Sequence, residues 1–437
     1  MKNTSVLFLC VGCIIGWGAF ILPQDLFLSK AGLLESIIGL GLVGVAICII
    51  AAQYTYLLQR YKRSGGEFYF TLKVLGRTHG FICGWFISLA YLCIIPLNAT
   101  ALNVMSHSFG FSGDIVLYHI NGNAIYLLDI VISMSSIVCI GILNILGIRA
   151  AFLLQKIFTL LLCGSVVLFF VIMGIDSASY ENFLSYFYQK EISLYGVMAV
   201  FALAPWAYLG FDCGVQIIQA IAYRKGIFNF FIYLSIWIGF ALYAMLICIT
   251  AFGVARDEII NLGWATHASI EGYFSIFGSI VLCIGVLSAL FSGINGFFIT
   301  TSKIFERLSI TCFIPATLIK QNRFNVSYRV VYVIGFISCV MVIFGRESLL
   351  YIVDMSCVGI IVGFLYVSII SLLLKQRERQ RISISSLLAL GLSIIFGLLI
   401  FVPFSPAALK LPSIIALAIW VLAGILLFAR ARRNASI

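Results

Sequence analysis

Residues 12–23 read Gly-Cys-Ile-Ile-Gly-Trp-Gly-Ala-Phe-Ile-Leu-Pro and lie inside the first long apolar segment of the chain. Three glycines and a proline give this segment several points at which a helix can break, because glycine costs about 1 kcal/mol relative to alanine and proline removes a backbone donor. In hydrocarbon, freed N–H and C=O groups persist only where protein, water or a ligand satisfies them. The stretch therefore indicates either close helix packing through small residues or a binding site.

The composition places the whole chain in a membrane. Of its 437 residues, 62% are hydrophobic and 10% are charged, which is more apolar surface than a soluble domain can bury. Apolar runs long enough to cross a bilayer recur about twelve times, which predicts an all-α integral membrane protein with about 12 transmembrane helices. The predicted spans are residues 4–23, 33–59, 80–105, 124–146, 150–174, 192–222, 227–254, 273–302, 326–344, 348–374, 384–404 and 411–429.

The distribution of basic residues predicts the orientation. With twelve spans, 22 of the 27 lysine and arginine residues fall on the side that holds both termini. Because basic residues are enriched in cytoplasmic loops, we expect a multi-pass protein of the cell membrane (plasma or inner) with both termini in the cytoplasm. The net charge of +11 is explained by these loops facing anionic lipid, so we expect the bilayer, and no nucleic acid, as a partner.

Reactive side chains form no recognisable catalytic or metal-binding pattern. The thirteen cysteines lie almost wholly in apolar spans, where they act as small hydrophobic residues, and the four histidines are scattered through loops. Cys10 and Cys13 have C-x-x-C spacing, but no partner pair follows. We therefore expect no enzyme activity, no cofactor and no metal. The first segment has one preceding lysine and no clean cleavage site, so we expect it to be retained.

A second interrupted apolar segment contains a single acidic residue. Asp212 is the only charged residue between Ile192 and Tyr223, and it follows Pro205 and Gly210. A charge at the centre of a span costs roughly 2.5–3.5 kcal/mol. Asp212 is therefore interpreted either as a satisfied helix cap or interhelical bond, or as a group for ligand binding or proton-linked gating.

The two interrupted segments are the first and the sixth. This spacing is typical of a secondary transporter built from two inverted five-helix repeats. Helix N-termini at such breaks attract anions and free carbonyls attract cations, so a zwitterion such as an amino acid satisfies both. We expect one transmembrane domain over 1–437, with inverted repeats at 1–175 and 192–374 and two additional helices at 384–429.

Four motifs occur in order between residues 12 and 315. They are Gly12-x-Ile14-Ile15-Gly16-x-Gly18-x-Phe20; Ser64-Gly65-Gly66-Glu67-Phe68-Tyr69 with Gly80-Phe81-x-x-Gly84-Trp85; Trp206-Ala207-Tyr208-Leu209-Gly210-Phe211-Asp212; and Ser302-Lys303-Ile304-Phe305 with Pro315. In this order they resemble the signatures of helix 1, the helix 2–3 connection, helix 6 and the end of helix 8 in the APC (amino acid–polyamine–organocation) superfamily, which includes the amino acid permeases.

The resemblance implies a substrate site at the two breaks. A substrate carboxylate would meet the backbone of residues 16–18, and an amino group would meet carbonyls of helices 1 and 6. Trp206 matches an aromatic residue that stacks on the substrate in arginine-exchanging members, and Asp212 matches an acid used in gating and proton sensing. Trp17 and Trp206 are also open to interpretation as packing residues. The expected substrate-binding residues are Cys13, Ile14, Gly16, Trp17, Gly18, Leu203, Ala204, Trp206 and Gly210.

Two residues, Trp17 and Leu162, depart from the family pattern. Trp17 stands where the usual residue is serine, and Leu162 stands where many members have a lysine in helix 5 whose ammonium replaces a sodium ion. Ser288, Ser292 and Asn295 in helix 8 are a possible cation site, or equally small-residue packing.

We therefore expect a secondary active transporter, a permease or exchanger, that moves amino acids or related amines by alternating access. A proton or an exchanged substrate is the possible coupling partner. The alternatives are a polyamine or amino-alcohol carrier and a non-transporting membrane amino-acid sensor. The sequence favours no particular oligomeric state.

Overall fold

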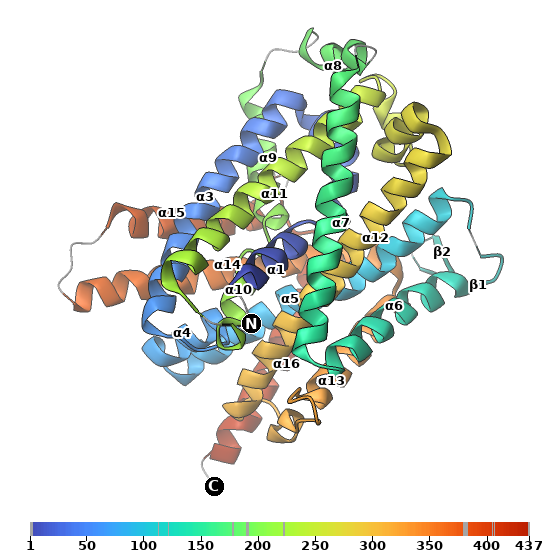
Figure 1. Cartoon of the computed structure of the whole chain (residues 1–437). Helices are drawn as coiled ribbons and strands as arrows, with labels where there is room; N and C mark the ends of the chain where they lie inside the picture. The colour runs from blue at the N-terminus through green and yellow to red at the C-terminus, as the bar shows by residue number, and fades with distance from the viewer. Residues whose placement is uncertain are drawn as a thin grey trace.

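The computed structural model describes residues 3–111, 113–120, 122–176, 179–188, 192–221, 223–378, 383–403, 405 and 407–435. In this part of the chain, nearly all regular structure is helical. The exception is an antiparallel hairpin, β1 (Val116–Ile120) and β2 (Asn123–Tyr126), at one edge of the helical bundle (Figure 1). The predicted all-α integral membrane class is confirmed.

The first half of the chain contributes two halves of a broken helix, four long helices and two shorter ones. They are α1 (Thr4–Ile14), α2 (Gly18–Leu22) with the π-helical η1 (Pro23–Ala31), α3 (Leu33–Arg60), α4 (Gly66–Leu75), α5 (Arg77–Ser108), α6 (Leu127–Ile145), α7 (Ile148–Ile175) and α8 (Ser179–Tyr188).

The second half begins with another interrupted helix and continues with longer ones. Its elements are α9 (Leu194–Ala207), α10 (Cys213–Gln216), η2 (Ile218–Ala220), α11 (Lys225–Gly253), η3 (Ile259–Asn261), α12 (Ala265–Ile310), η4 (Ala316–Ile319), α13 (Tyr328–Ile343), α14 (Gly345–Arg377), α15 (Ile384–Phe401) and α16 (Leu411–Ala435).

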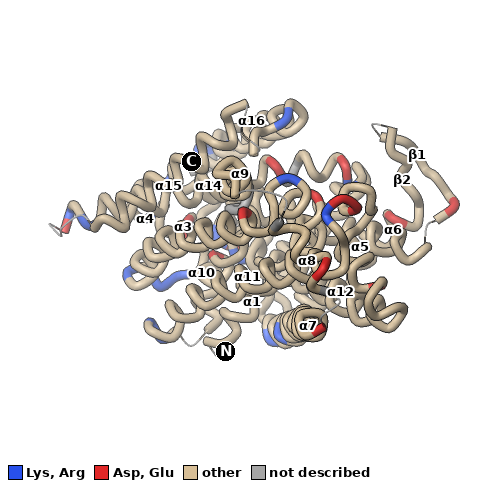
Figure 2. The backbone as a smooth tube through the Cα atoms, turned by 90° about the horizontal axis from the view of Figure 1, so that it is seen from above, with Lys and Arg blue, Asp and Glu red and all other residues tan. Residues whose placement is uncertain are grey.

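Every predicted span coincides with a helix or an interrupted helix. Among the described residues, nine helices are long and apolar enough to cross a membrane, and the bent pair at the N-terminus makes a tenth. The other two predicted spans contain α9 and α13, which are shorter than the roughly 20 residues a span needs. Charged residues lie mainly at helix ends and in connections, as Figure 2 shows.

The structure corrects several predicted boundaries. The first residues of the span predicted at 124–146 belong to β2, which pairs with β1 in the hairpin, and the helix α6 begins only at Leu127. The span predicted at 273–302 lies inside the longer α12, whose backbone leaves helical geometry at Ser275. The short helices α4 and α8 have no counterpart among the predicted spans, because ten residues are too few to cross a bilayer.

Helix α5 forms the centre of the bundle. Of its most apolar window, 89% is buried, against 11% for α16. It packs against α14, α12, α4 and α6. The exposed large apolar side chains of α16 are expected for a surface that faces lipid.

A pair of tryptophans attaches α16 to this centre. The rings of Trp85 in α5 and Trp420 in α16 stack with centroids 4.2 Å apart. The Trp85 indole N–H donates to the Trp420 carbonyl at 3.0 Å, and the Trp420 indole N–H donates to the Trp85 carbonyl at 3.3 Å. Because lipid is as apolar as the helix surfaces, these packing and hydrogen-bond terms hold α16 in place.

We predict that Trp420→Ala lowers the free energy of unfolding in detergent by roughly 1–3 kcal/mol, since it removes the ring stacking and the hydrogen bond that the Trp420 indole donates. The measurement is thermal unfolding of the purified protein. Trp237→Ala is the matched control, because Trp237 is 42% exposed on α11. Equal midpoints for the two variants would contradict the role given to the tryptophan pair.

Candidate substrate site

The first helix breaks where the glycines occur. α1 ends at Ile14 and α2 begins at Gly18, and the two halves of the segment are bent by 47°. The Ile15 N–H closes the last turn on the Val11 carbonyl at 3.1 Å. In the described structure, the backbone N–H groups of Gly16 and Gly18 have no hydrogen-bond partner. The start of α2 therefore offers free donors to an anionic group.

The sixth predicted span breaks a few residues after Pro205. α9 ends at Ala207, residues 208–212 form turns, and α10 begins at Cys213. Gly210 has a φ of +125°, a conformation that other residues rarely adopt. The turn leaves part of the backbone outside regular helix at the level of the first break.

The two breaks fit into each other through their glycines. A Cβ atom at Gly18 would overlap the Trp206 ring, and a Cβ atom at Gly210 would lie 2.9 Å from the backbone nitrogen of Ile14. Each glycine therefore leaves space for atoms of the other interrupted helix. Larger residues at either position would push the two breaks apart.

Six of the predicted site residues line one small cavity between the breaks. Its volume is about 30 Å³, room for no more than a few water molecules. Asn98 and Tyr243 from α5 and α11 also line it. Gly210 packs behind it, and Leu203 and Ala204 lie in the part of α9 whose side chains are outside the described set. The predicted residues in the lining are Cys13, Ile14, Gly16, Trp17, Gly18 and Trp206.

Trp17 closes one side of this cavity. Its ring packs on Trp264 with centroids 5.0 Å apart, and the Arg346 guanidinium carbon lies 5.8 Å from a Trp17 ring centroid. Its backbone N–H donates to Asn98 Oδ1 at 3.4 Å. The Trp264 indole N–H donates to the Phe20 carbonyl at 3.1 Å, which holds the α11–α12 connection over the break. Trp17 is therefore part of a closed aromatic layer.

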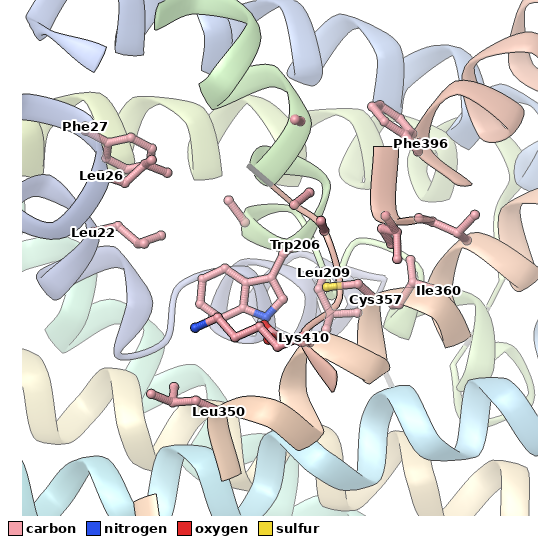
Figure 3. Close-up of a pocket in the computed structure, with 17 residues that line it drawn as sticks. Leu22, Leu26, Phe27, Trp206, Leu209, Leu350, Cys357, Ile360, Phe396 and Lys410 are labelled. Carbon is pink, nitrogen blue, oxygen red and sulfur yellow. The ribbon is translucent and has the colours of Figure 1, made fainter. Parts of the chain in front are cut away.

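Trp206 closes the other side and faces a larger cavity. This second cavity has a volume of about 310 Å³, within the range of small-molecule sites. Figure 3 shows Trp206 between the side chains of Leu22, Leu26 and Phe27 and those of α14 and α15. The lining is mainly apolar, and its two charged residues are Asp354 and Lys410.

The environment of Trp206 leaves one polar atom unsatisfied. Its indole N–H is buried and donates no hydrogen bond to any described residue. A buried donor without a partner is costly. The Trp206 indole N–H is therefore a donor that this arrangement of the described residues leaves unused.

Asp212 is buried and hydrogen-bonded. It is 1% exposed, the Tyr91 hydroxyl donates to its Oδ2, and the Gly210 N–H donates to its Oδ1 at 3.3 Å. Tyr91 belongs to α5, so the acid joins the second break to the central helix. This geometry contains the interhelical bond considered from the sequence, and it leaves the gating role as a prediction.

The residues predicted as a possible cation site lie in an amide network. Asn295 Nδ2 donates to Gln155 Oε1 at 2.8 Å, and Gln155 Nε2 donates to Ser292 Oγ at 2.8 Å. Ser288 is buried one turn earlier on α12. In the same region Thr159 donates to the Phe8 carbonyl of α1 at 2.9 Å. Neutral side chains thus occupy the space between α1, α7 and α12.

Leu162 and the nearby Lys156 of α7 make none of the hydrogen bonds of this network. Leu162 is fully buried, and Lys156 is exposed with its ammonium 5.7 Å from the Phe8 ring centroid. Gln155, four residues before Thr159, extends toward α1 instead, where its Nε2 lies 3.5 Å from the Phe8 carbonyl oxygen. Helical spacing could have identified Gln155 from the sequence, because Gln155, Thr159 and Leu162 are four and seven residues apart and therefore share one face of α7.

Other site residues carry no charge and were not predicted. Asn98 follows Pro96 in the middle of α5, and Tyr91 precedes it by two turns on the same helix. A polar residue in an apolar span is a usable signal, since burial there requires a partner. Tyr91 gives none, because tyrosine also occurs in spans as a packing aromatic.

Comparison with known proteins identifies the family of the chain. A family model described as amino acid permease matches residues 3–428. A search of curated proteins gives no match to the chain. The family match extends over both interrupted helices and nearly all of the described structure. The chain therefore belongs to the amino acid permease family of the APC superfamily.

Proposed function

We propose that this permease moves amino acids or related amines across the cell membrane by alternating access, with the substrate held between the two breaks. The free N–H groups of Gly16 and Gly18 carry the proposal. They open onto a cavity at a helix start, where a carboxylate is favoured by both hydrogen bonding and the helix dipole. An amino group would meet carbonyls near Cys13 and Ile14 and those of Leu203 and Ala204.

The closed inner cavity supports a transport cycle. At about 30 Å³ it is too small for an amino acid, so a substrate enters only if a wall moves. Trp206 separates it from the cavity of about 310 Å³. We infer that displacement of the Trp206 ring joins the two spaces and gives its N–H a partner.

The larger cavity also suits a zwitterion. Asp354 and Lys410 line the same space, and apolar side chains from η1, α14 and α15 form the rest of its surface. A molecule carrying an ammonium and a carboxylate meets a complementary charge for each. This arrangement favours an amino acid over a polyamine, which has no group for Lys410.

The repeat organisation and orientation belong to the same proposal. Residues 1–175 and 192–374 form the inverted repeats, 384–429 the additional helices, and both termini face the cytoplasm. The two breaks, one in each half, support the repeat assignment.

We predict that the protein, reconstituted in liposomes, shows saturable uptake or exchange of at least one labelled compound in a panel of amino acids, amino alcohols and polyamines. Because the site presents groups for both ends of a zwitterion, amino acids should outcompete their amino-alcohol analogues. Preference for polyamines would select the amine-carrier alternative. Binding of an amino acid without movement under any gradient would select the sensor.

We predict that Gly18→Leu weakens binding of the transported amino acid by about 10-fold or more, the loss expected for hydrogen bonds to a charged group. The added side chain displaces Trp206 and covers the free donors. Equilibrium binding to purified protein is the measurement.

Gly164→Leu is the matched control, since a Cβ there meets nothing within 4 Å and the residue is exposed on α7. Unchanged affinity in Gly18→Leu, with the thermal midpoint preserved, would place the substrate elsewhere.

A further inference from the structure

A second buried acid lies beside the second half of the sixth segment. Glu67 is in the first turn of α4 and has no exposed surface. α4 packs against α3, α5 and α14. Gln216, at the end of α10, is also fully buried, and its Nε2 donates to Glu67 Oε2 at 2.5 Å. The side chains of these two residues thus join α4 to α10.

The other two oxygens of this pair lack a donor. Glu67 Oε1 and Gln216 Oε1 are both buried and have no hydrogen-bond partner in the described structure. Both are acceptors when the carboxyl group is ionised, so neither can satisfy the other. A proton on Glu67 supplies the missing donor, and the acid and the amide then form two reciprocal hydrogen bonds.

Exchanging the amide oxygen and nitrogen of Gln216 does not remove this need. The amide oxygen would then face Glu67 Oε2, and that contact would again require a proton on the carboxyl group. The Tyr54 hydroxyl, itself buried and without another partner, is close enough to Glu67 to donate to the carboxyl group. Within the pair, however, the amide oxygen of Gln216 gains a donor in either assignment only when Glu67 is neutral.

The surrounding charges point the same way. The titratable groups that act on Glu67 are Asp212 of the second break, Tyr54 of α3, and Cys83 and Tyr91 of α5, with no lysine or arginine among them. The facing surface of α14 is the backbone of Gly363. Asp212 already accepts from Tyr91 and Gly210, so it is the better acid to hold a negative charge. Burial and the Asp212 charge raise the pKa of Glu67 to about 8.

We propose that Glu67 is a proton-binding site whose protonated form latches α4 to α10 through Gln216. The residues that flank these two helices are also joined: Ser64, just before α4, and Gln219, in η2 after α10, each donate a backbone N–H to the other's side chain at 3.3 Å. When these segments separate, water reaches Glu67, the O–H bond breaks, and the carboxylate releases its proton to water. Resting on the proposed transport function, this assigns the proton as a ligand whose release accompanies opening at α4.

Infrared spectroscopy of the full-length purified protein tests proton occupancy directly. We expect a carbonyl band of a buried, protonated carboxyl group at pH 7 that loses half its amplitude near pH 8. The band should be absent in Glu67→Gln, which preserves the shape of the pair. The band should persist in Asp212→Asn, but the pH at which it loses half its amplitude should be lower than in the wild type. The negative charge of Asp212, which raises the pKa of Glu67, is absent from this variant. An identical band in wild type and Glu67→Gln, or no band at pH 7, overturns the proposal.

Thermal unfolding provides a second readout. Folding raises the pKa of Glu67 from 4.5 to about 8, so its contribution to stability is fully present below pH 4.5 and is lost as the pH rises through 8. The unfolding midpoint of the wild type should therefore fall relative to that of Glu67→Gln between pH 6 and pH 9. A difference that stays constant over this range contradicts the latch. If Glu67→Gln does not fold, Glu67→Asp replaces it, and its shorter carboxyl should titrate at lower pH.

The two proposals fail separately. An infrared band with no movement of any panel compound leaves the proton site and removes the transport function. Transport without the band removes the proton site alone. If both proposals hold, the transport rate of Glu67→Gln should change between pH 7 and pH 9 by less than half as much as the transport rate of the wild type.

Discussion

The fold depends on the close fit between two helices that are each interrupted inside the apolar bundle. Gly18 leaves room for the Trp206 ring, and Gly210 leaves room for the backbone of Ile14. Because neither break can accept a larger residue without moving the other, the free N–H groups of Gly16 and Gly18 are held against the second break. In hydrocarbon such groups require partners. The same fit that brings the helices together therefore creates a site that a ligand completes.

The surrounding layers keep this site closed in the present conformation. Trp17 packs under Trp264 on one side, and Trp206 separates the inner cavity from a larger one on the other. Asp212 connects the second break to α5 through Tyr91. Movement of the second break would thus be transmitted to the central helix and, through Gln216 and Glu67, to α4. Substrate access and the proton at Glu67 are in this way linked by contiguous contacts.

Much of the fold could be predicted from sequence because membrane spans are long and apolar. The glycines at 12–18 and the run from Pro205 to Asp212 identified both breaks, and the four motifs identified the family. Side-chain partners could not be predicted in the same way. Nothing in the spacing indicates that the Trp17 ring packs on Trp264, or that Gln155 rather than a residue at 156 or 162 reaches α1. Glu67 was part of a motif, but its burial depends on α10 and α14, which are far from α4 in the sequence.

The central claim is that an amino acid binds to the free backbone donors of the interrupted first helix. Hydrogen–deuterium exchange of the reconstituted permease, with and without a saturating transported amino acid, tests it most directly. The account predicts slower exchange in peptides covering Gly16–Gly18 and the turn at 208–212, with no change in α16. Protection confined to other segments, with exchange at both breaks unaltered by a bound amino acid, would contradict it.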